Sequence, residues 1–277
     1  MTNRVAIVTG GLRGLGQSMT LGLARTGVKV LAVGHIDTDV PAMSGIENVQ
    51  PFVGDIRTPD GCDRILAEAL KLFGRIDILV NNAGLTFTTT EPDRYRRNER
   101  QKFWEVPDGV VQAVLNTNYV GASQMTHRVA PLLVAQGWGR IVNVTTKLST
   151  MNVPGAMPYG ASKAALEMAT EVWAKELAGS GVTANIVNPG AGANTPGMAR
   201  EMRDRSAAGT APKLVEPDQM VPPLLFVVSA AADKVNGYRF DANNWDIALP
   251  PMAAAKTAGR PAGLVLHPQD TADWPLG

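Results

Sequence analysis

The sequence predicts an α/β protein built on a doubly wound parallel sheet of about seven strands, with helices on both faces. Short apolar runs alternate with longer segments of helical periodicity, which is the pattern of successive βαβ units. The apolar runs lack polar alternation, so the strands are expected to be buried on both sides. Strands are predicted at 5–8, 29–33, 50–53, 76–80, 140–144, 183–187 and, more weakly, 238–240, and helices at 15–25, 59–73, 109–134, 159–178 and 218–229.

The composition indicates a soluble cytoplasmic protein. Hydrophobic residues make up 45% of the 277-residue chain, and the formal net charge is +1, which argues against a nucleic-acid or membrane-surface partner. The lone cysteine, Cys62, fits a reducing compartment. We expect no signal peptide, no membrane span and, because the three histidines are scattered, no metal site.

The chain reads as one domain over residues 1–250, followed by a Pro-rich tail at 251–277. A polar, charge-dense insertion occupies residues 85–106, and Phe103 and Trp104 are expected to anchor it by packing. A segment rich in Gly, Ala, Thr and Pro at 190–217 is expected to form a flap over a site.

A glycine-rich segment, TGGLRGLG at Thr9–Gly16, lies between the first predicted strand and the first predicted helix. Gly10, Gly14 and Gly16 allow a ligand to approach the backbone closely, and the helix N-terminus that begins near Leu15 favours a pyrophosphate. Three glycines alone also fit a structural turn. Their position at a strand-to-helix junction predicts a dinucleotide-binding, Rossmann-type site.

The end of the second strand bears on which dinucleotide is bound. His35 occupies the place where an acidic residue usually holds the NAD ribose, and Arg13 in the glycine segment can pair with a 2′-phosphate. Asp37, two residues later, argues for NAD. We expect NADP, with NAD as the alternative.

Tyr159 and Lys163 are four residues apart on a predicted helix and therefore share one face. An ammonium beside a phenol is expected to lower the tyrosine pKa, which would make Tyr159 a general acid and base near neutral pH. Packing on a helix surface is the alternative for such a pair taken alone.

Together these motifs resemble the short-chain dehydrogenase/reductase family, in its single-domain branch. The resemblance covers about residues 1–245 and includes TGGLRGLG (9–16), GDI (54–56), NNAG (81–84), NTNYVG (116–121), YGASK (159–163) and NPG (188–190), in the family's order. The resemblance implies that Tyr159 exchanges a proton with the substrate oxygen and that Lys163 also binds the nicotinamide ribose. It implies catalytic roles for Asn118 and for Thr146, which stands where the family has serine.

The resemblance also implies further cofactor contacts. These are Asp55 and Ile56 at the adenine, Asn82, Ala83 and Gly84 beside the adenosine, and Pro189, Gly190 and Thr195 at the nicotinamide, in addition to Gly10, Arg13, Gly14, Leu15, Gly16 and His35. Thr145 is expected to be structural, because its side chain should point away from Thr146. The C-terminal segment from Asn236 departs from the family pattern.

The function expected from these features is hydride transfer between NADP(H) and a carbonyl or secondary alcohol. The alternatives are a catalytically weak dinucleotide-binding regulator and an enzyme of epimerisation or dehydration on the same fold. The substrate stays open among a cyclic or aromatic ketone, a sugar derivative and an acyl thioester. The resemblance implies a homotetramer or homodimer formed through the helices at 109–134 and 159–178.

Overall fold

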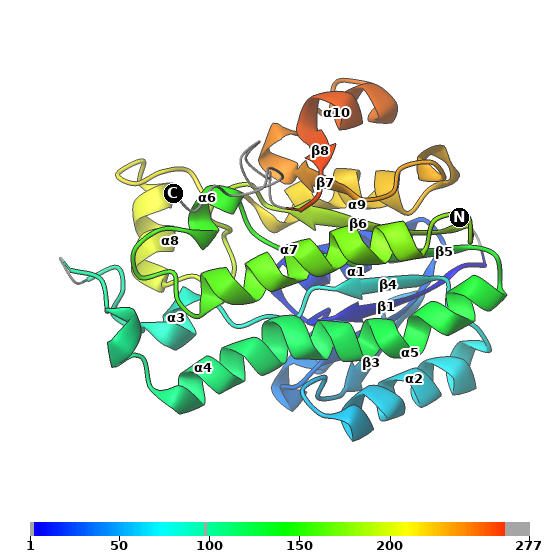
Figure 1. The fold of residues 1–277 in the computed structure, drawn as a ribbon, viewed down its shortest axis with the longest axis horizontal. Coiled ribbons are helices and arrows are strands. Elements are labelled where there is room, and N and C mark those ends of the chain that lie inside the picture. Colours follow the sequence, from blue (N-terminus) through cyan, green and yellow to red (C-terminus); the bar gives the residue numbers. More distant parts are fainter. Residues whose placement is uncertain (1–2, 97–98, 264–277) are drawn as a thin grey trace, which may run out of the picture.

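The computed structural model describes residues 3–96 and 99–263. An eight-stranded sheet in the order β3-β2-β1-β4-β5-β6-β7-β8 forms its centre, and β8 alone runs antiparallel to its neighbour (Figure 1). The strands are β1 (Val5–Thr9), β2 (Lys29–Gly34), β3 (Val49–Val53), β4 (Ile78–Asn81), β5 (Gly139–Asn143), β6 (Val182–Asn188), β7 (Tyr238–Asp241) and β8 (Gly259–Pro261). The predicted doubly wound parallel sheet is confirmed.

Helices cover both faces of the sheet (Figure 1). One face packs on the helices α2 (Pro59–Phe73), α4 (Asp108–Leu115), α5 (Gly121–Ala135) and α7 (Tyr159–Glu176), and the other on α1 (Gly14–Arg25), α9 (Val221–Val227) and α10 (Pro251–Ala258). Each face has its own apolar core, because alternate residues of the buried strands point to opposite sides. In β1, Ile7 joins one core, while Ala6 and Val8 join the other.

Local capping explains why some helix limits follow the sequence closely. The α2 helix spans the predicted range because Thr58 accepts a hydrogen bond from the Gly61 N–H at 3.1 Å and Pro59 fits the first turn. At its other end Gly74 takes a left-handed φ of 74°. The predicted helix 109–134 is instead divided, because residues Asn116–Val120 form a π-helical turn between α4 and α5.

The prediction of a structureless tail is wrong for residues 251–261. Ala254, Ala255 and Ala258 are buried on one side of α10 and pack in the same core as α9, and β8 extends the sheet beside β7. Alanine gives only a weak hydrophobic periodicity in the sequence, but its small side chain lets α10 pack closely against the core. The remainder of the predicted tail, 264–277, lies outside the described residues.

The insertion and the flap lie at one end of the molecule, beyond the carboxyl ends of the strands (Figure 1). The insertion contains α3 (Phe87–Thr90), and the flap contains α8 (Arg200–Ala207). The hydroxyls of Thr86 and Thr88 both donate to the carbonyl of Gly197, at 2.8 and 2.9 Å. The two segments are therefore held together by direct hydrogen bonds.

Phe103 and Trp104 do not anchor the insertion, contrary to expectation. Their rings pack edge to face at 5.0 Å, but the two side chains are 68% and 69% exposed. The charged residues Glu91 and Arg94 are buried instead. The remaining short elements are α6 (Leu148–Met151) and the 3-10 turns Asp37–Asp39, Pro41–Met43, Phe103–Glu105, Pro217–Met220, Ala230–Ala232 and Ala242–Asn244.

Throughout residues 3–96 and 99–263, each helix is too short or too polar to cross a membrane.

Candidate active site

The glycine segment forms the tight turn between β1 and α1. Gly10 and Gly14 have φ angles of 63° and 57°, a region that residues with a Cβ rarely adopt. A Cβ on Gly10 would lie 2.8 Å from Asn82 Nδ2, and one on Gly16 would lie 2.0 Å from the Gly10 carbonyl oxygen. Glycine is therefore required here by both conformation and space, and the turn leaves the N-terminus of α1 open.

The N-terminus of α1 has free donors for an anion. Arg13 is the N-cap residue, its side chain makes no capping hydrogen bond, and the first turn carries no acidic residue. The first backbone N–H groups of such a helix lack intrahelical partners and attract negative charge. Arg13 itself forms an ion pair with Asp39, with Nε 3.6 Å from Oδ2.

Tyr159, Lys163 and Thr146 meet at the carboxyl end of β5. The α7 helix presents Tyr159 and Lys163 on one side, and Thr146 lies three residues beyond the last residue of β5. The Thr146 side chain lies close enough to the phenol of Tyr159 to lower its pKa. Lys163 is buried, and its Nζ donates to the carbonyl of Val144 at 2.8 Å. Thr145 instead donates to Glu167 Oε2 at 3.0 Å, so its predicted structural role agrees with the contacts.

The expectation that Lys163 lowers the pKa of Tyr159 is not met. Burial raises the pKa of Tyr159 to about 12, although the hydrogen bond from Thr146 lowers it in part and Tyr95 raises it further. Burial also lowers the pKa of Lys163 to about 8. The ammonium is directed at a backbone carbonyl, and desolvation dominates both groups. A neutral phenol is therefore the resting form at neutral pH.

Asn118 lies in the π-helical turn and is fully buried. Its Nδ2 donates to the Leu85 carbonyl at 3.0 Å and to Ser162 Oγ at 2.9 Å, and its Oδ1 accepts from the Leu85 N–H at 2.7 Å. A Cβ on Gly84 would lie 3.3 Å from both Asn118 Oδ1 and Lys163 Nζ. Asn118 thus ties the loop after β4 to α7 close to the lysine ammonium.

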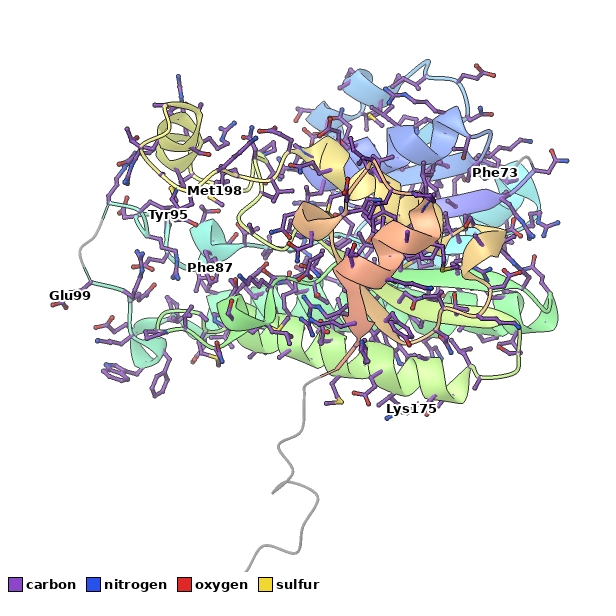
Figure 2. The ribbon with its side chains drawn as sticks, turned by 90° about the horizontal axis from the view of Figure 1, so that it is seen from above. Phe73, Phe87, Tyr95, Glu99, Lys175 and Met198 are labelled. Carbon is purple, nitrogen blue, oxygen red and sulfur yellow. The ribbon has the colours of Figure 1, made fainter. Side chains whose placement is uncertain are left out.

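An aromatic and cationic stack from the insertion covers Tyr159. The Phe87 ring lies 4.5 Å from the Tyr159 ring, and the guanidinium of Arg94 lies 4.0 Å from the centre of the Phe87 ring. Arg94 Nη1 also donates to the Gly155 carbonyl at 2.7 Å. Phe87, Tyr95 and Met198 lie at the same end of the molecule (Figure 2). Phe87, Arg94 and Tyr95 were missed in the sequence, where only the aromatic character of Phe87 and Tyr95 within a polar segment distinguished them.

One cavity of about 370 Å³ connects the glycine turn with Tyr159. Most predicted site residues line it, namely Gly10, Arg13, Gly14, Leu15, His35, Asn82, Ala83, Gly84, Thr146, Tyr159, Lys163, Pro189 and Thr195. Its walls also include Gly34, Ile36 and Asp39 at one end and Phe87, Tyr95 and Met198 at the other. The residues predicted from separate motifs therefore converge on one elongated space.

Five predicted residues lie outside the lining of this cavity: Gly16, Asp55, Ile56, Asn118 and Gly190. Asp55 is turned to Arg57, whose Nη2 lies 2.6 Å from Oδ2 and whose hydrogen bond is the main cause of its lowered pKa. Ile56 packs in the core, where it contacts Gly121. Gly190 has a φ of 76°, so it serves the turn after β6. Asp39, not the predicted Asp37, is the acidic residue that reaches the cavity.

The cavity fits a nicotinamide dinucleotide in three respects. Its length runs from the open N-terminus of α1 to the phenol, and the glycine turn leaves room that a Cβ on Gly10 would fill. The end of the cavity near His35 also contains Arg13, whose guanidinium can bind an anion or a ribose. The inner end holds two donors, the buried Lys163 and the partly exposed Tyr159.

Comparison with known proteins gives the same result. The model of the short chain dehydrogenase family matches residues 4–206. The chain is 30% identical to a 3-oxoacyl-(acyl-carrier-protein) reductase from Thermotoga maritima, covering 86% of this chain and 95% of the relative. It is 32% identical to a 2-dehydro-3-deoxy-D-gluconate 5-dehydrogenase from Escherichia coli, covering 86% and 93%.

Solved structures agree. A 3-ketoacyl-(acyl-carrier-protein) reductase from Brucella melitensis complexed with NADH superimposes with a TM-score of 0.74 at 26% identity, covering 87% of this chain and 96% of that one. A candidate NAD(P)-dependent gluconate 5-dehydrogenase from Beutenbergia cavernae, with bound NADP at low occupancy, gives 0.73 at 30% identity, covering 87% and 96%. The family model spans most of the chain, and it matches the strands and helices that build the site. The chain is an oxidoreductase of the short-chain dehydrogenase family.

Proposed function

We propose that this protein transfers a hydride between NADP(H) and a carbonyl or secondary alcohol, with Tyr159 as the general acid and base. The observation that carries the proposal is that Thr146, Tyr159 and Lys163 line the same cavity as the glycine turn. The nicotinamide, when bound, supplies or accepts the hydride. The side chains supply position and the proton.

The protonation states favour Tyr159 as the acid of the reductive direction. With a pKa of about 12, the phenol keeps its proton at neutral pH and can donate it to a substrate oxygen. Thr146 offers a hydroxyl to the same oxygen. In the oxidative direction Tyr159 must first lose its proton, so we expect that direction to gain from rising pH.

Lys163 and Asn118 complete the site. Lys163 is held by the Val144 carbonyl, and its pKa of about 8 leaves it mostly charged at neutral pH. Asn118 holds Leu85, in the loop after β4, and Ser162, the residue before Lys163 on α7, by hydrogen bonds. We propose that Lys163 binds the cofactor ribose and that Asn118 positions the surrounding loop.

The preference for NADP rests on Arg13 and His35 at the outer end of the cavity. Arg13 is half exposed and its pairing with Asp39 is long, at 3.6 Å, so it is free to turn to a 2′-phosphate. Asp39 opposes this preference, since its carboxylate can hold a ribose hydroxyl instead. We propose Gly10, Gly14, Leu15, Asn82, Ala83, Gly84, Pro189 and Thr195 as the other cofactor contacts.

We propose a small-molecule carbonyl or alcohol as substrate, since the relatives in this comparison include a 3-oxoacyl-(acyl-carrier-protein) reductase and a 2-dehydro-3-deoxy-D-gluconate 5-dehydrogenase. We also propose a cytoplasmic homotetramer or homodimer formed through α4, α5 and α7. Val134, Met168 and Val172 are exposed apolar residues on these helices, which supports an interface there. Light scattering would decide the oligomeric state, and a monomer at micromolar concentration would refute the proposed oligomer.

The test of the enzymatic proposal compares Tyr159→Phe with wild type by nicotinamide absorbance, using NADPH and then NADH against a panel of ketones and alcohols. We expect turnover to fall by roughly 10²–10⁴-fold, because the phenylalanine lacks the proton donor. Cofactor binding, measured by calorimetry, should be retained.

Tyr238→Phe is the matched control. Tyr238 is largely exposed on β7 and outside the lining of the cavity, so this variant should keep wild-type turnover. If Tyr159→Phe also retained full turnover, the proposed role of Tyr159 would be wrong. Cofactor binding in a wild type that turns over no compound would favour the regulatory alternative.

A further inference from the structure

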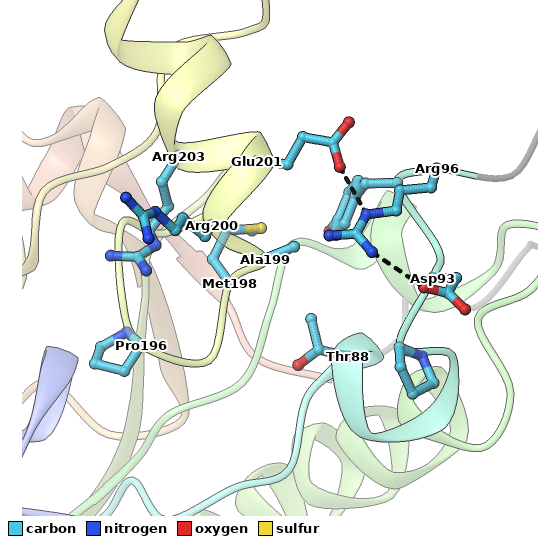
Figure 3. A pocket seen from close by; sticks show the side chains of 11 residues that line it. Thr88, Asp93, Arg96, Pro196, Met198, Ala199, Arg200, Glu201 and Arg203 are labelled. Atoms are coloured by element: carbon cyan, nitrogen blue, oxygen red, sulfur yellow. Dashed lines mark hydrogen bonds and ion pairs between the residues drawn. The ribbon is translucent and has the colours of Figure 1, made fainter.

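A second cavity of about 460 Å³ lies between the insertion and the flap (Figure 3). The residues that line it come from the insertion (Thr88, Pro92, Asp93, Tyr95 and Arg96) and from the flap (Pro196, Met198, Ala199, Arg200, Glu201 and Arg203). Thr88, Tyr95, Pro196 and Met198 line both this cavity and the candidate active site. The two spaces are therefore neighbours, and they meet at the end of the active site that contains Tyr95 and Phe87.

The two carboxylates of the second cavity, Asp93 and Glu201, both pair with one arginine. Arg96 Nε lies 3.1 Å from Glu201 Oε2, and Arg96 Nη1 lies 3.7 Å from Asp93 Oδ1 (Figure 3). These three residues bridge the insertion and the first turn of α8. The other two arginines of the lining do not take part in these ion pairs.

Those two arginines, Arg200 and Arg203, extend from α8 toward the side of the cavity where Pro196 lies (Figure 3). Arg203 makes no ion pair within the part of the chain that the structure describes, and its buried Nε has no hydrogen-bond partner. Arg200 has one long contact, with Nε 3.7 Å from Asp204 Oδ2, and the side chains of Arg200 and Asp204 are 87% and 70% exposed. Burying an unpaired guanidinium donor is costly, so the arrangement favours an anionic partner.

We propose that the second cavity binds an oxyanion of the substrate, a carboxylate or a phosphate ester, through Arg203 with Arg200. A planar guanidinium matches either group with paired hydrogen bonds. The proposal rests on the proposed function, since it requires the carbonyl of the same molecule to reach Tyr159. It names the substrate class as an oxo acid, or a phosphorylated ketone, whose charged group lies beyond Tyr95 and Met198.

The experiment compares straight-chain oxo acids of increasing length, their methyl esters and ketones that carry a phosphate ester. The measured quantity is the ratio of kcat/KM for the anion to that for the neutral ester, in wild type, Arg203→Gln and Arg203→Lys at saturating NADPH. We expect wild type to favour the anion at one chain length by roughly tenfold or more, the worth of a charged hydrogen bond. Arg203→Gln should remove most of this preference, and Arg203→Lys should restore part of it.

Arg205→Gln is the matched control. Arg205 is an exposed arginine on the same helix, outside the lining of the second cavity, and its substitution changes the net charge equally. It should leave the ratio of anion to ester unchanged. Equal use of acid and ester by wild type, or an equal loss in Arg203→Gln and Arg205→Gln, would overturn the proposal. So would a change in the preference for NADPH over NADH in Arg203→Gln with no change in the substrate ratio.

A second readout does not depend on turnover. Calorimetry measures binding of an unreactive alkanoate of matching length, or of its phosphate analogue, to the enzyme loaded with NADP. If no ketone is reduced, the proposed function fails, but alkanoate or phosphate binding that is lost in Arg203→Gln and kept in Arg205→Gln still supports the oxyanion site. Absence of such binding in wild type refutes that site, whatever the activity.

Discussion

Arg239 Nη1 lies 2.7 Å from Glu167 Oε2, and both side chains are fully buried. Arg239 Nη2 donates to the Thr146 carbonyl at 2.8 Å, and Glu167 accepts from the Thr145 hydroxyl at 3.0 Å. The pair therefore holds the backbone and one side chain of the two threonines that follow β5. Thr146 can direct its hydroxyl to Tyr159 because its backbone is fixed from the opposite side.

We predict that Arg239→Met lowers the free energy of unfolding by about 3–5 kcal/mol, because Glu167 would be left as an unpaired buried charge. Urea denaturation followed by circular dichroism measures the change. The double variant Arg239→Met/Glu167→Leu should lose less than the sum of the two single variants.

Lys175 and Glu171 provide the control for burial. Their Nζ and Oε1 atoms are also 2.7 Å apart, but Lys175 is mostly exposed, and water screens the pair. Lys175→Met should therefore change the stability by no more than about 0.5 kcal/mol. Equal losses in Arg239→Met and Lys175→Met would contradict the role assigned to burial.

A second prediction separates the two threonines. Thr146→Ser keeps the hydroxyl beside Tyr159 and should retain most of the activity, whereas Thr146→Val should lower kcat/KM by roughly tenfold or more, since a hydrogen bond to the reacting oxygen is lost. Thr145→Val should destabilise the fold by about 1–3 kcal/mol, because the buried Glu167 carboxylate loses the hydrogen bond from the Thr145 hydroxyl. Steady-state kinetics and thermal melting of the three variants distinguish the effects. A greater kinetic loss in Thr145→Val than in Thr146→Val would refute the assignment.

Much of the fold and of the site was predictable because the signals are local. The Thr58 cap and Gly74 set the limits of α2, apolar runs mark the strands, and the spacing of Tyr159 and Lys163 places both on one helix face. Parallel strands bring their carboxyl ends to one edge, so residues from distant motifs meet there. Thr146, Tyr159 and Lys163 are brought together in this way.

The rest depends on contacts between distant segments. That Phe87 covers Tyr159 and Arg94 covers Phe87 follows from the path of the insertion, which no periodicity encodes. The pKa of Tyr159 was expected in the wrong direction, because the spacing from Lys163 shows proximity but not burial. The hydrogen bond from Arg57 to Asp55, the residue predicted at the adenine, likewise could not be read from the sequence.

A third prediction concerns the choice of cofactor. Asp39→Asn removes the partner of Arg13 and leaves the guanidinium available for a 2′-phosphate, so we expect the ratio of kcat/KM for NADPH to that for NADH to rise by roughly tenfold. Arg13→Gln should lower the same ratio by a similar factor. Asp37→Asn is the control, because the Asp37 carboxylate accepts from the Thr38 N–H in its own turn and does not line the cavity. An unchanged ratio in both Asp39→Asn and Arg13→Gln would show that the specificity lies elsewhere.

A fourth prediction concerns the pH dependence of stability. The pKa of Lys163 is lowered from 10.5 to about 8, so between these values the unfolded chain holds a proton that the folded chain has lost. Stability due to this group must therefore rise with pH across that interval, by roughly 1.4 kcal/mol for each pH unit. The pKa of Tyr159 is raised from 10.0 to about 12, so its contribution is present at lower pH and is lost as the pH rises from 10 to 12.

Unfolding free energies measured at fixed pH between 7 and 12 in wild type, Lys163→Met and Tyr159→Phe test both signs. The difference between wild type and Lys163→Met should increase between pH 8 and 10.5, and that between wild type and Tyr159→Phe should decrease above pH 10. Lys175→Met, which removes an exposed ammonium, should show no such rise. A difference for Lys163→Met that stays flat across the interval would mean that Lys163 is not held in a desolvated state. Desolvation at one site raises the pKa of Tyr159 and lowers that of Lys163. The enzyme without cofactor should therefore show both effects on stability, the rise below pH 10.5 and the fall above pH 10.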